Sequence, residues 1–318
     1  MNVFITGATG FAGQHLVNSL LSQKHDIFGT SYPEMPEEIH GLQKEQVKEN
    51  IFHMDIRKAR ELEDKLKDIQ PDWLFHLAAV SNVGQSWEDR KNAMEVNIMG
   101  SFNLLEAVRK FTPHTRILFI SSSDVYGGLS KKEKRLKETD QINIVNPYAL
   151  TKANTEMMCH FYASIENLDI IIARAFPHTG PGQNSIFVCS DWALQIARIE
   201  KNLAEPVIKV GNLKAGRDFS DVRDVVKAYI LLMEQGRKGE TYNICSGEIT
   251  ELKTVLDILI SYSSKDIQIQ VDKEKLRKVD IQFLCGDNQK IKKETGWKPE
   301  TPLKQTLFDL LEYWRGTI

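Results

Sequence analysis

Three glycines near the start of the chain restrict the fold more than any other feature. Gly7, Gly10 and Gly13 follow a short apolar run, Asn2–Thr6, and open a pattern typical of an amphipathic helix at Ala12–Gln23. At such a turn one glycine turns the chain, one lets the backbone approach a pyrophosphate, and one lets the helix pack on the strand. The helix N-terminus offers free N–H groups and a positive dipole to the phosphates. A plain glycine-rich turn is the alternative, but the position between strand and helix favours dinucleotide binding.

The first half of the chain alternates short apolar runs with longer amphipathic ones. We expect strands at Asn2–Thr6, Ile27–Thr30, Trp73–Leu77, Arg116–Ser121 and Ile170–Arg174. We expect helices at Ala12–Gln23, Ala59–Ile69, Lys91–Lys110 and Pro147–Ile165. Strands rich in Ile, Phe and Leu without polar alternation are typical of burial on both faces. Their alternation with helices predicts an α/β fold with a doubly wound parallel sheet of the Rossmann type.

The pattern changes after Arg174, where a stretch rich in Gly and Pro leaves the sheet. We expect later helices and strands at Ser190–Lys201, Val207–Val210, Asp221–Glu234, Tyr242–Cys245, Glu251–Ser261 and Leu303–Trp314. The third and fourth of these return to the first domain. The predicted division is therefore a dinucleotide-binding domain of residues 1–175 plus 218–246, and a smaller mixed α/β substrate-binding lobe of residues 176–217 plus 247–318.

Charge and composition exclude several classes of protein. The 318 residues include 41 basic and 43 acidic side chains, so no bulk basic field supports nucleic-acid binding. The longest apolar runs are far shorter than the ~20 residues of a membrane span, and the early glycine turn leaves no room for a signal peptide. We therefore expect a cytoplasmic protein that binds neither nucleic acid nor membranes. The cysteines and histidines show no metal-ligand spacing, so we expect reduced cysteines and no metal site.

A tyrosine and a lysine four residues apart are the candidate catalytic pair. Tyr148 and Lys152 follow Asn146 and Pro147, which are typical of an N-cap and a first helical residue. The helix would place both side chains on one face, one turn apart. Upstream, an expected strand ends in a serine-rich stretch, 121–124, at the carboxyl edge where α/β sheets hold their ligands.

This set suits hydride transfer to or from a sugar carbon, which needs a partner acid–base for the carbinol proton. A tyrosine with a pKa near 10 is a poor base at neutral pH, and a lysine ammonium one turn away is expected to lower that pKa. A serine hydroxyl can hold the same substrate oxygen. The alternative is a surface tyrosine and lysine beside a serine-rich turn. The order of glycine triplet, serine-rich strand end and Y-x-x-x-K favours catalysis.

The expected second strand bears on the choice of cofactor. An NAD site usually has an acid at the end of this strand for the ribose 2′-OH, but residues 29–32 hold neither an acid nor an arginine. The hydroxyls of Thr30 and Ser31 tolerate a 2′-phosphate, so NADPH is favoured and NADH remains open. Asp55 and Ile56 are placed to reach the adenine amine. For Asp55 the alternative is an N-cap of the helix that begins near Ala59.

Several stretches resemble extended short-chain dehydrogenase/reductases that act on nucleotide sugars. They are TGATGFAG (6–13), HLAA (76–79), VNIMGSFNLLEA (96–107), SSSDVYG (121–127), PYALTK (147–152) and GPGQ (180–183). Within this family the chain most resembles GDP-4-dehydro-6-deoxy-D-mannose reductases, with GDP-mannose 4,6-dehydratases as near relatives. The stretches 208–229, 242–247, 276–280 and 295–307 carry that finer likeness.

The resemblance implies roles for individual residues. The catalytic group would be Ser122, Tyr148 and Lys152, with Asp124 beside them. The NADP (or NAD) site would add Gly7, Gly10, Phe11, Ala12, Gly13, Thr30, Ser31, Asp55, Ile56, Leu77, Ala78 and Ala79. The substrate would meet Asn97, Ser123, His178, Lys209, Arg217 and Arg277. The arginine fork meets phosphate oxygens two at a time, although surface ion pairs are the alternative for both arginines.

Two departures from the family pattern bear on the substrate and the reaction. Pro177 stands where relatives have an asparagine, and a proline has neither an amide side chain nor a backbone N–H, so it re-shapes the contact with the diphosphate or the sugar. Asp124 stands where relatives usually have glutamate, and its neighbour Ser123 is not a second acid. A dehydratase needs a base for the C5 proton and an acid for the C6 hydroxyl, so Asp124 and Ser123 favour a reductase.

We therefore expect NAD(P)H-dependent reduction of the C4 keto group of a nucleotide-4-keto-6-deoxyhexose. The type substrate is GDP-4-dehydro-6-deoxy-D-mannose, giving a GDP-6-deoxyhexose such as GDP-D-rhamnose. The alternatives are a 4,6-dehydratase or 4-epimerase that recycles its cofactor, the same reduction on a UDP-linked sugar, and a non-catalytic dinucleotide-binding regulator. The family pairs the helices at Lys91–Lys110 and Pro147–Ile165 into a four-helix bundle, so we expect a homodimer.

Overall fold

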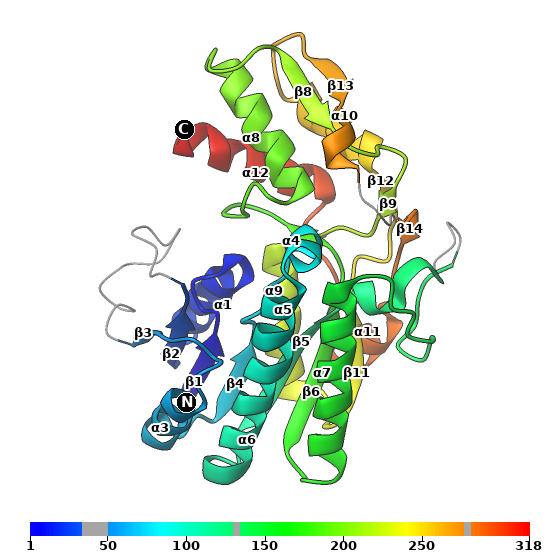
Figure 1. Cartoon of the computed structure of the whole chain (residues 1–318). Coiled ribbons are helices and arrows are strands. Elements are labelled where there is room, and N and C mark those ends of the chain that lie inside the picture. The colour runs from blue at the N-terminus through cyan, green and yellow to red at the C-terminus, as the bar shows by residue number, and fades with distance from the viewer. Residues whose placement is uncertain (34–49, 130–133, 277–280) are drawn as a thin grey trace.

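A seven-stranded parallel sheet forms the centre of the computed structural model, which describes residues 1–33, 50–129, 134–276 and 281–318 (Figure 1). Its strands, in spatial order, are β11 (Thr241–Ile244), β6 (Asp169–Ala175), β5 (Arg116–Ser122), β4 (Trp73–His76), β1 (Asn2–Thr6), β2 (Asp26–Ser31) and β3 (Ile51–His53). Every neighbouring pair is parallel. The order reverses beside β1, and this is the topology of a doubly wound fold. The predicted Rossmann-type fold is confirmed.

Helices cover both faces of the sheet, which explains why its strands are apolar without alternation. One face packs against α1 (Phe11–Ser22), α9 (Val222–Gln235) and α11 (Gln289–Thr295). The other packs against α3 (Ala59–Ile69), α6 (Ser101–Phe111) and α7 (Pro147–Ser164). Residues on strand ends therefore have only one open direction, the carboxyl edge of the sheet.

A separate hydrophobic cluster lies beyond that edge (Figure 1). It is built from α8 (Val188–Glu200), β8 (Val207–Val210), α10 (Leu252–Ser261) and α12 (Leu303–Thr317), and β13 (Gln268–Val271) pairs in parallel with β8. We call these elements the lobe. The division of the chain into two domains stays a prediction. Residues 289–297, which fell in the predicted second domain, contribute Ile291 and Trp297 to the core beside the sheet.

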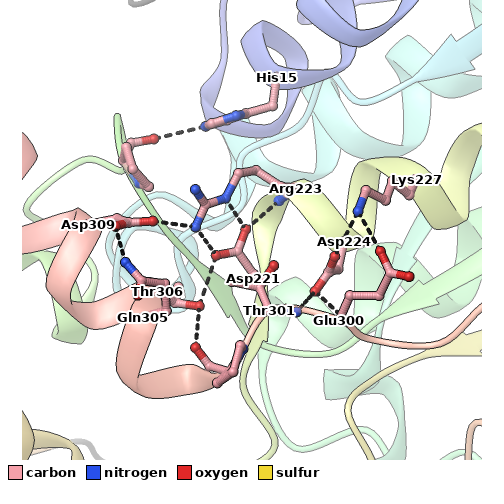
Figure 2. Close-up of polar contacts among 12 residues, drawn as sticks. His15, Asp221, Arg223, Asp224, Lys227, Glu300, Thr301, Gln305, Thr306 and Asp309 are labelled. Carbon is pink, nitrogen blue, oxygen red and sulfur yellow. Dashed lines mark hydrogen bonds and ion pairs between the residues drawn. The ribbon is translucent and has the colours of Figure 1, made fainter.

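A polar cluster ties the start of α9 to the lobe helix α12 (Figure 2). Asp221 caps α9, and its buried carboxylate accepts hydrogen bonds from Arg223 and from Thr306 on α12. Arg223 also pairs with Asp309 at 2.7 Å. One turn later, the Asp224 carboxylate accepts the backbone N–H of Thr301. These bonds fix α9 at the junction of sheet and lobe.

Some elements differ from the sequence expectation. The single helix expected at Lys91–Lys110 is α5 (Arg90–Met94), a π-helical turn (Glu95–Gly100) and α6. Inside that turn the carbonyl of Asn97 accepts hydrogen bonds from the hydroxyls of Ser101 and Thr155, which suits a widened turn. The sequence analysis also missed elements too short for a periodic pattern. These are β3, α4 (Val83–Glu88), α11, β13, β7 (His178–Thr179), β9 (Gly216–Arg217), β10 (Ser220–Asp221), β12 (Thr250–Glu251) and β14 (Phe283–Leu284).

Candidate active site

A cavity of about 1550 Å³ opens at the carboxyl edge of the sheet, between the sheet and the lobe. Its wall includes the glycine-rich turn, the ends of β4, β5 and β6, the start of α7, and lobe residues from α8 and the segment at residues 211–219. The cavity is larger than the usual range for a single small ligand, so it can hold a dinucleotide and a second molecule together.

The glycine-rich turn has the shape that a diphosphate needs. Gly7 has φ +72°, and a Cβ there would lie 2.9 Å from the backbone nitrogen of Ala78. A Cβ on Gly13 would lie 2.2 Å from the carbonyl oxygen of Gly7. Helix α1 begins after Gly10 with no side-chain cap, so its first N–H groups face the cavity. These residues fit a dinucleotide.

The predicted adenosine residues cluster at the end of β2. The Thr30 hydroxyl accepts the Gly7 N–H at 3.1 Å, and the hydroxyls of Ser31 and Thr9 lie 2.7 Å apart. Both predicted hydroxyl residues therefore brace the glycine-rich turn, and of the two only Thr30 lines the cavity. Their expected contact with a 2′-phosphate stays a prediction.

Asp55 and Ile56 also line the cavity, and Asp55 does not cap helix α3, whose N-cap is Lys58. Burial opposes ionisation of Asp55, but hydrogen bonds from Arg57 outweigh burial and lower its pKa. Sequence analysis missed Arg57, whose guanidinium also reaches the Tyr32 hydroxyl at the end of β2, 3.3 Å away.

The candidate catalytic side chains meet in the same cavity. Asn146 caps α7 by accepting the Ala149 N–H at 2.7 Å, and Pro147 is the first helical residue, as predicted. Tyr148 and Lys152 are buried and face the cavity from α7. The Lys152 Nζ donates to the carbonyl of Ile120 at 2.7 Å and lies 5.9 Å from the centre of the Tyr148 ring.

Ser122 and Asp124 lie opposite this pair at the end of β5 and just beyond it, and both line the cavity. The Ser122 hydroxyl accepts the Asp124 N–H at 3.1 Å and lies 3.3 Å from an oxygen of the Asp124 carboxylate. Ser123, the next predicted substrate contact, also reaches the cavity wall. The strand end therefore presents hydroxyl groups and one carboxylate toward Tyr148.

The protonation of the pair differs from the sequence expectation. Burial raises the pKa of Tyr148, the charge of Asp124 raises it further, and the hydrogen bond with Ser122 acts against both. The net direction is therefore opposite to the lowered pKa that we expected, because burial has the larger effect and the Lys152 ammonium is bound to a backbone carbonyl. Stabilisation of a tyrosinate by Lys152 stays a prediction. Burial also lowers the pKa of Lys152 to about 8. Tyr148 is therefore a protonated phenol at neutral pH, which is the form that can donate a proton.

A buried ion pair supports the catalytic helix. Glu156 lies one turn after Lys152 and pairs with Arg174 of β6 at 2.8 Å. Ser121 of β5 donates a hydrogen bond to the same carboxylate. The pair ties α7 to the ends of two strands. Sequence analysis missed Glu156, although its position four residues after Lys152 places it on the same helix face.

Other predicted cofactor and substrate residues also reach the cavity wall. They are Gly10, Phe11, Ala12, Leu77, Ala78, Ala79, His178 and Arg217. The His178 ring stacks on Phe11 with 5.9 Å between ring centres, and its Nδ1 shares a hydrogen bond with the carbonyl of Phe176. Burial lowers the pKa of His178, so its ring is neutral.

Two predicted substrate residues lie elsewhere, and a third cannot be placed. The Asn97 amide is buried and bonds to the backbone of Val80 and the hydroxyl of Thr151, so it positions the loop after β4. Lys209 has an exposed side chain on β8 and is not part of the cavity wall. Neither residue is part of the cavity wall, and their predicted contacts with the substrate stay predictions. Arg277 lies outside the described residues.

The lobe wall carries charged groups that the sequence analysis did not single out. Lys275 pairs with Asp191 of α8, and Glu274 lies beside it. Next to Arg217, the buried carboxylate of Asp218 accepts the N–H groups of Gly247 and Gly286 and fixes the strand that bears the arginine. Contacts between distant segments build this wall, so no local motif marks it.

The described residues form neither a cluster of metal ligands nor a membrane-spanning helix. Nowhere in the described part of the chain do three or more His, Cys, Asp or Glu side chains gather as metal ligands. Its helices include none with the length and hydropathy needed to cross a bilayer. The four cysteines, Cys159, Cys189, Cys245 and Cys285, are buried and unpaired by disulfides.

Comparison with known proteins agrees with this geometry. The family model described as GDP-mannose 4,6 dehydratase matches residues 4–310. The chain is 31% identical over 317 residues to the GDP-6-deoxy-D-mannose reductase of Pseudomonas aeruginosa, covering 99% of this chain and 98% of the relative. The solved structure of RMD from Pseudomonas aeruginosa with NADPH superposes with TM-score 0.85 at 30% identity and full coverage of both chains. The UDP-glucose 4-epimerase of Thermus thermophilus with NAD gives TM-score 0.87 at 25% identity, again covering both chains fully.

Proposed function

We propose that this chain reduces a C4 keto group. The chain belongs to the GDP-mannose 4,6-dehydratase family and is an NAD(P)-dependent enzyme that acts on nucleotide sugars. The substrate would be a nucleotide-linked 4-keto-6-deoxyhexose of the GDP-4-dehydro-6-deoxy-D-mannose type, and the product a GDP-6-deoxyhexose such as GDP-D-rhamnose. The full-length likeness to a GDP-6-deoxy-D-mannose reductase carries the proposal. A buried tyrosine held in its proton-donating form supports it.

The residues of this chain supply the acid and the binding groups. When bound, NADPH supplies the hydride for C4. Tyr148 donates its phenolic proton to the C4 oxygen. The Ser122 hydroxyl turns its single proton from the Asp124 carboxylate to the same oxygen when the substrate binds. The Lys152 ammonium stabilises the tyrosinate that remains and holds the ribose next to the nicotinamide. On the lobe side, Arg217 binds the diphosphate of the sugar nucleotide.

Asp124 bears on the direction of the chemistry. A dehydratase needs a base to remove the C5 proton, and the Asp124 carboxylate lies against the Ser122 hydroxyl. The adjacent Ser123 supplies no second acid. This arrangement favours a reductase, in which Asp124 orients the serine and no C5 proton is removed.

The preferred cofactor is NADPH, with NADH usable. The relative in complex with NADPH supports the phosphorylated form. Arg57 lies 3.3 Å from the hydroxyl of Tyr32, just after β2, and it is already paired with Asp55 at 2.6 Å. Because that ion pair neutralises Arg57, selection against NADH should be modest.

Cofactor stoichiometry tests the proposed reaction. The protein is incubated with NADPH and a panel of GDP-, UDP-, dTDP- and CDP-linked 4-keto-6-deoxy sugars, and the loss of NADPH absorbance is followed. We expect one NADPH consumed per sugar reduced, fastest with the GDP sugar. Formation of a keto sugar or an epimer without net NADPH use would instead assign a dehydratase or an epimerase, and binding without any turnover would favour a regulator.

A homodimer is proposed from apolar side chains on two helical segments. Large apolar side chains on the π-helical turn, on α6, on α7 and at the C-cap of α7 are 39–70% exposed. They are Met99, Phe102, Met157, Phe161 and Ile165. Large exposed apolar groups gathered on neighbouring helices are typical of an interface, and in the resembled family these helices form a four-helix bundle. Light scattering at micromolar concentration should give about twice the monomer mass of 36.3 kDa. A mass near that of the monomer would contradict the dimer.

A further inference from the structure

A second tyrosine lines the cavity, and none of the roles proposed above uses it. Tyr229 belongs to α9, is 1% exposed, and lines the cavity together with Ile120 and Ala175. Among the described residues, its hydroxyl has no hydrogen-bond partner. The residue as a whole is buried, but its hydroxyl does not belong to the fully buried atoms that lack a partner, so the hydroxyl borders the cavity.

Other buried tyrosines show how unusual this is. The hydroxyl of Tyr126 donates to the amide oxygen of Asn243 at 2.7 Å, and the hydroxyl of Tyr242 donates to Glu294 at 2.6 Å. Buried polar atoms in folded proteins almost always have such partners, because an unsatisfied group keeps its full desolvation cost. An unpartnered phenol that faces a ligand cavity indicates that a bound molecule completes its bonding.

The position of Tyr229 identifies the part of the ligand that reaches it. Helix α9 packs on the same face of the sheet as α1, whereas Tyr148 comes from α7 on the opposite face. The glycine-rich turn accounts for the diphosphate, and the proposed roles of Tyr148 and Lys152 account for the adjoining ribose. The nicotinamide ring is the remaining part of the cofactor. Ile120 packs against the cluster that contains Tyr229 and also lines the cavity, so it offers an apolar surface to the ring.

The hydroxyl of Tyr229 is a hydrogen-bond donor. Burial raises the pKa of Tyr229, so the phenol stays protonated and can donate its proton to an acceptor on a bound molecule. A carboxamide oxygen is a neutral acceptor of the right kind. Helix α9 is held by the Asp221, Arg223 and Asp224 contacts at its first turn, which keeps the phenol in place (Figure 2).

We propose that Tyr229 is a cofactor-binding residue whose phenolic hydroxyl donates a hydrogen bond to the carboxamide oxygen of the nicotinamide. The inference rests on the NAD(P) dependence stated in the proposed function. It does not depend on which sugar is reduced, or on whether the chain is a reductase, a dehydratase or an epimerase.

Binding measurements without sugar test this contact. The Kd values of NADPH and of 2′-phospho-ADP-ribose, which lacks the nicotinamide, are measured by calorimetry for the wild type and Tyr229→Phe. We expect the Kd of NADPH to rise about tenfold, in line with the loss of one hydrogen bond to a buried partner, and that of 2′-phospho-ADP-ribose to change less than twofold. Tyr242→Phe removes a buried phenol far from the cavity and should change neither Kd.

The outcomes separate this inference from the proposed reaction. Equal weakening of both ligands in Tyr229→Phe, or an unchanged Kd for NADPH, would overturn the contact. A raised KM for the keto sugar with an unchanged Kd for NADPH would also overturn it, by assigning the hydroxyl to the sugar. If the wild type consumes no NADPH with any sugar, the proposed reaction fails, yet the ratio of the two Kd values still decides the role of Tyr229. Tyr229→Leu is the second variant, and thermal unfolding confirms that each variant is folded.

Discussion

The two walls of the cavity are built on different principles. The sheet wall is made partly of closely packed backbone, such as the turn at Gly7, which lies against the backbone of Ala78. It also contains buried side chains such as Tyr148, which a capped helix holds in place. The lobe wall is made of charged side chains held by contacts between distant segments, such as the pair of Lys275 with Asp191 and the bonds of Asp218. The sheet wall suits a fixed cofactor and its chemistry, and the lobe wall suits the choice of sugar nucleotide.

This difference has a measurable consequence. Changes in the sheet wall should alter turnover or cofactor affinity and leave the affinity for the sugar nucleotide intact. Changes in the lobe wall should weaken the affinity for the sugar nucleotide and leave turnover and cofactor affinity intact. A variant that moves both quantities together would show that the two walls act as one unit.

The sharpest test of the sheet wall is Tyr148→Phe. The ring and its packing remain, but the proton donor is lost, and general acid groups typically contribute about 10²–10⁴-fold. We expect kcat to fall at least about 100-fold while the Kd of NADPH changes little. Stopped-flow and binding measurements separate the two quantities. Retention of full turnover would remove Tyr148 from catalysis.

A glycine substitution tests the backbone part of the same wall. In Gly13→Ala the new Cβ would lie 2.2 Å from the Gly7 carbonyl and 2.8 Å from the Ala8 carbonyl, so the turn must move. We expect NADPH affinity to fall about 30-fold or more, from the strain of an overpacked site. Gly316→Ala in α12 is the matched control, since nothing lies within 4 Å of its Cβ. Equal NADPH affinity of the two variants would contradict a role of the glycine-rich turn in binding the diphosphate.

Arg217→Ala tests the lobe wall. Hydrogen bonds to charged groups contribute about 1.5–3 kcal/mol, so the KM of the keto sugar should rise about tenfold or more. The Kd of NADPH should stay within twofold. Arg217→Lys keeps the charge but loses the fork, and we expect an intermediate KM. If the Kd of NADPH changed as much as the KM of the keto sugar, the two walls would not have separate functions.

How far the sequence predicts each wall follows from the same difference. The glycine-rich turn and the Asn146 cap act through neighbours in the chain, so their spacing reveals them, and the structure confirms both shapes. The fold was predictable for the same reason, because each long strand is a short apolar run and each long helix has an amphipathic period. The lobe wall depends on pairs such as Lys275 with Asp191, which are far apart in sequence and follow no period.

Individual side chains were harder to place from the sequence than the elements that bear them, for physical reasons. Asn97 lies in a π-helical turn that rotates its amide toward the backbone of Val80. Lys209 is the exposed residue between two buried ones on the short strand β8. A family likeness at that position does not show to which side of the strand the lysine side chain points. The pKa of Tyr148 was misjudged because spacing along a helix shows the nearby lysine but not the depth of burial. Tyr229 was missed because its motif reads as an ordinary amphipathic helix.

The pH dependence of turnover sharpens the account of the sheet wall. Burial lowers the pKa of Lys152 to about 8, so its ammonium is present below that pH and lost above it. If that charge stabilises the tyrosinate, kcat/KM should be level below about pH 8 and fall about tenfold per unit above it. Lys152→Arg should be slower but show no break near pH 8, because arginine keeps its charge. A profile for the wild type that stays level to pH 10 would contradict a role for the ammonium.

The smallest expected effect concerns Asp124, which lies where the two walls meet. In a reductase no C5 proton is removed, and this carboxylate only orients the Ser122 hydroxyl, 3.3 Å away. Asp124→Asn keeps the size and a hydrogen-bond acceptor, so turnover should fall only several-fold, well under 100-fold. In a dehydratase the same carboxylate is the best available base, and its loss should cost about 10²–10⁴-fold. Removing the charge also removes one cause of the raised pKa of Tyr148. A break in the pH profile of turnover that comes from ionisation of the Tyr148 phenol should therefore move to lower pH. Keto-sugar formation from a nucleotide hexose, with no net NADPH use and abolished in Asp124→Asn, would replace the reductase with a dehydratase.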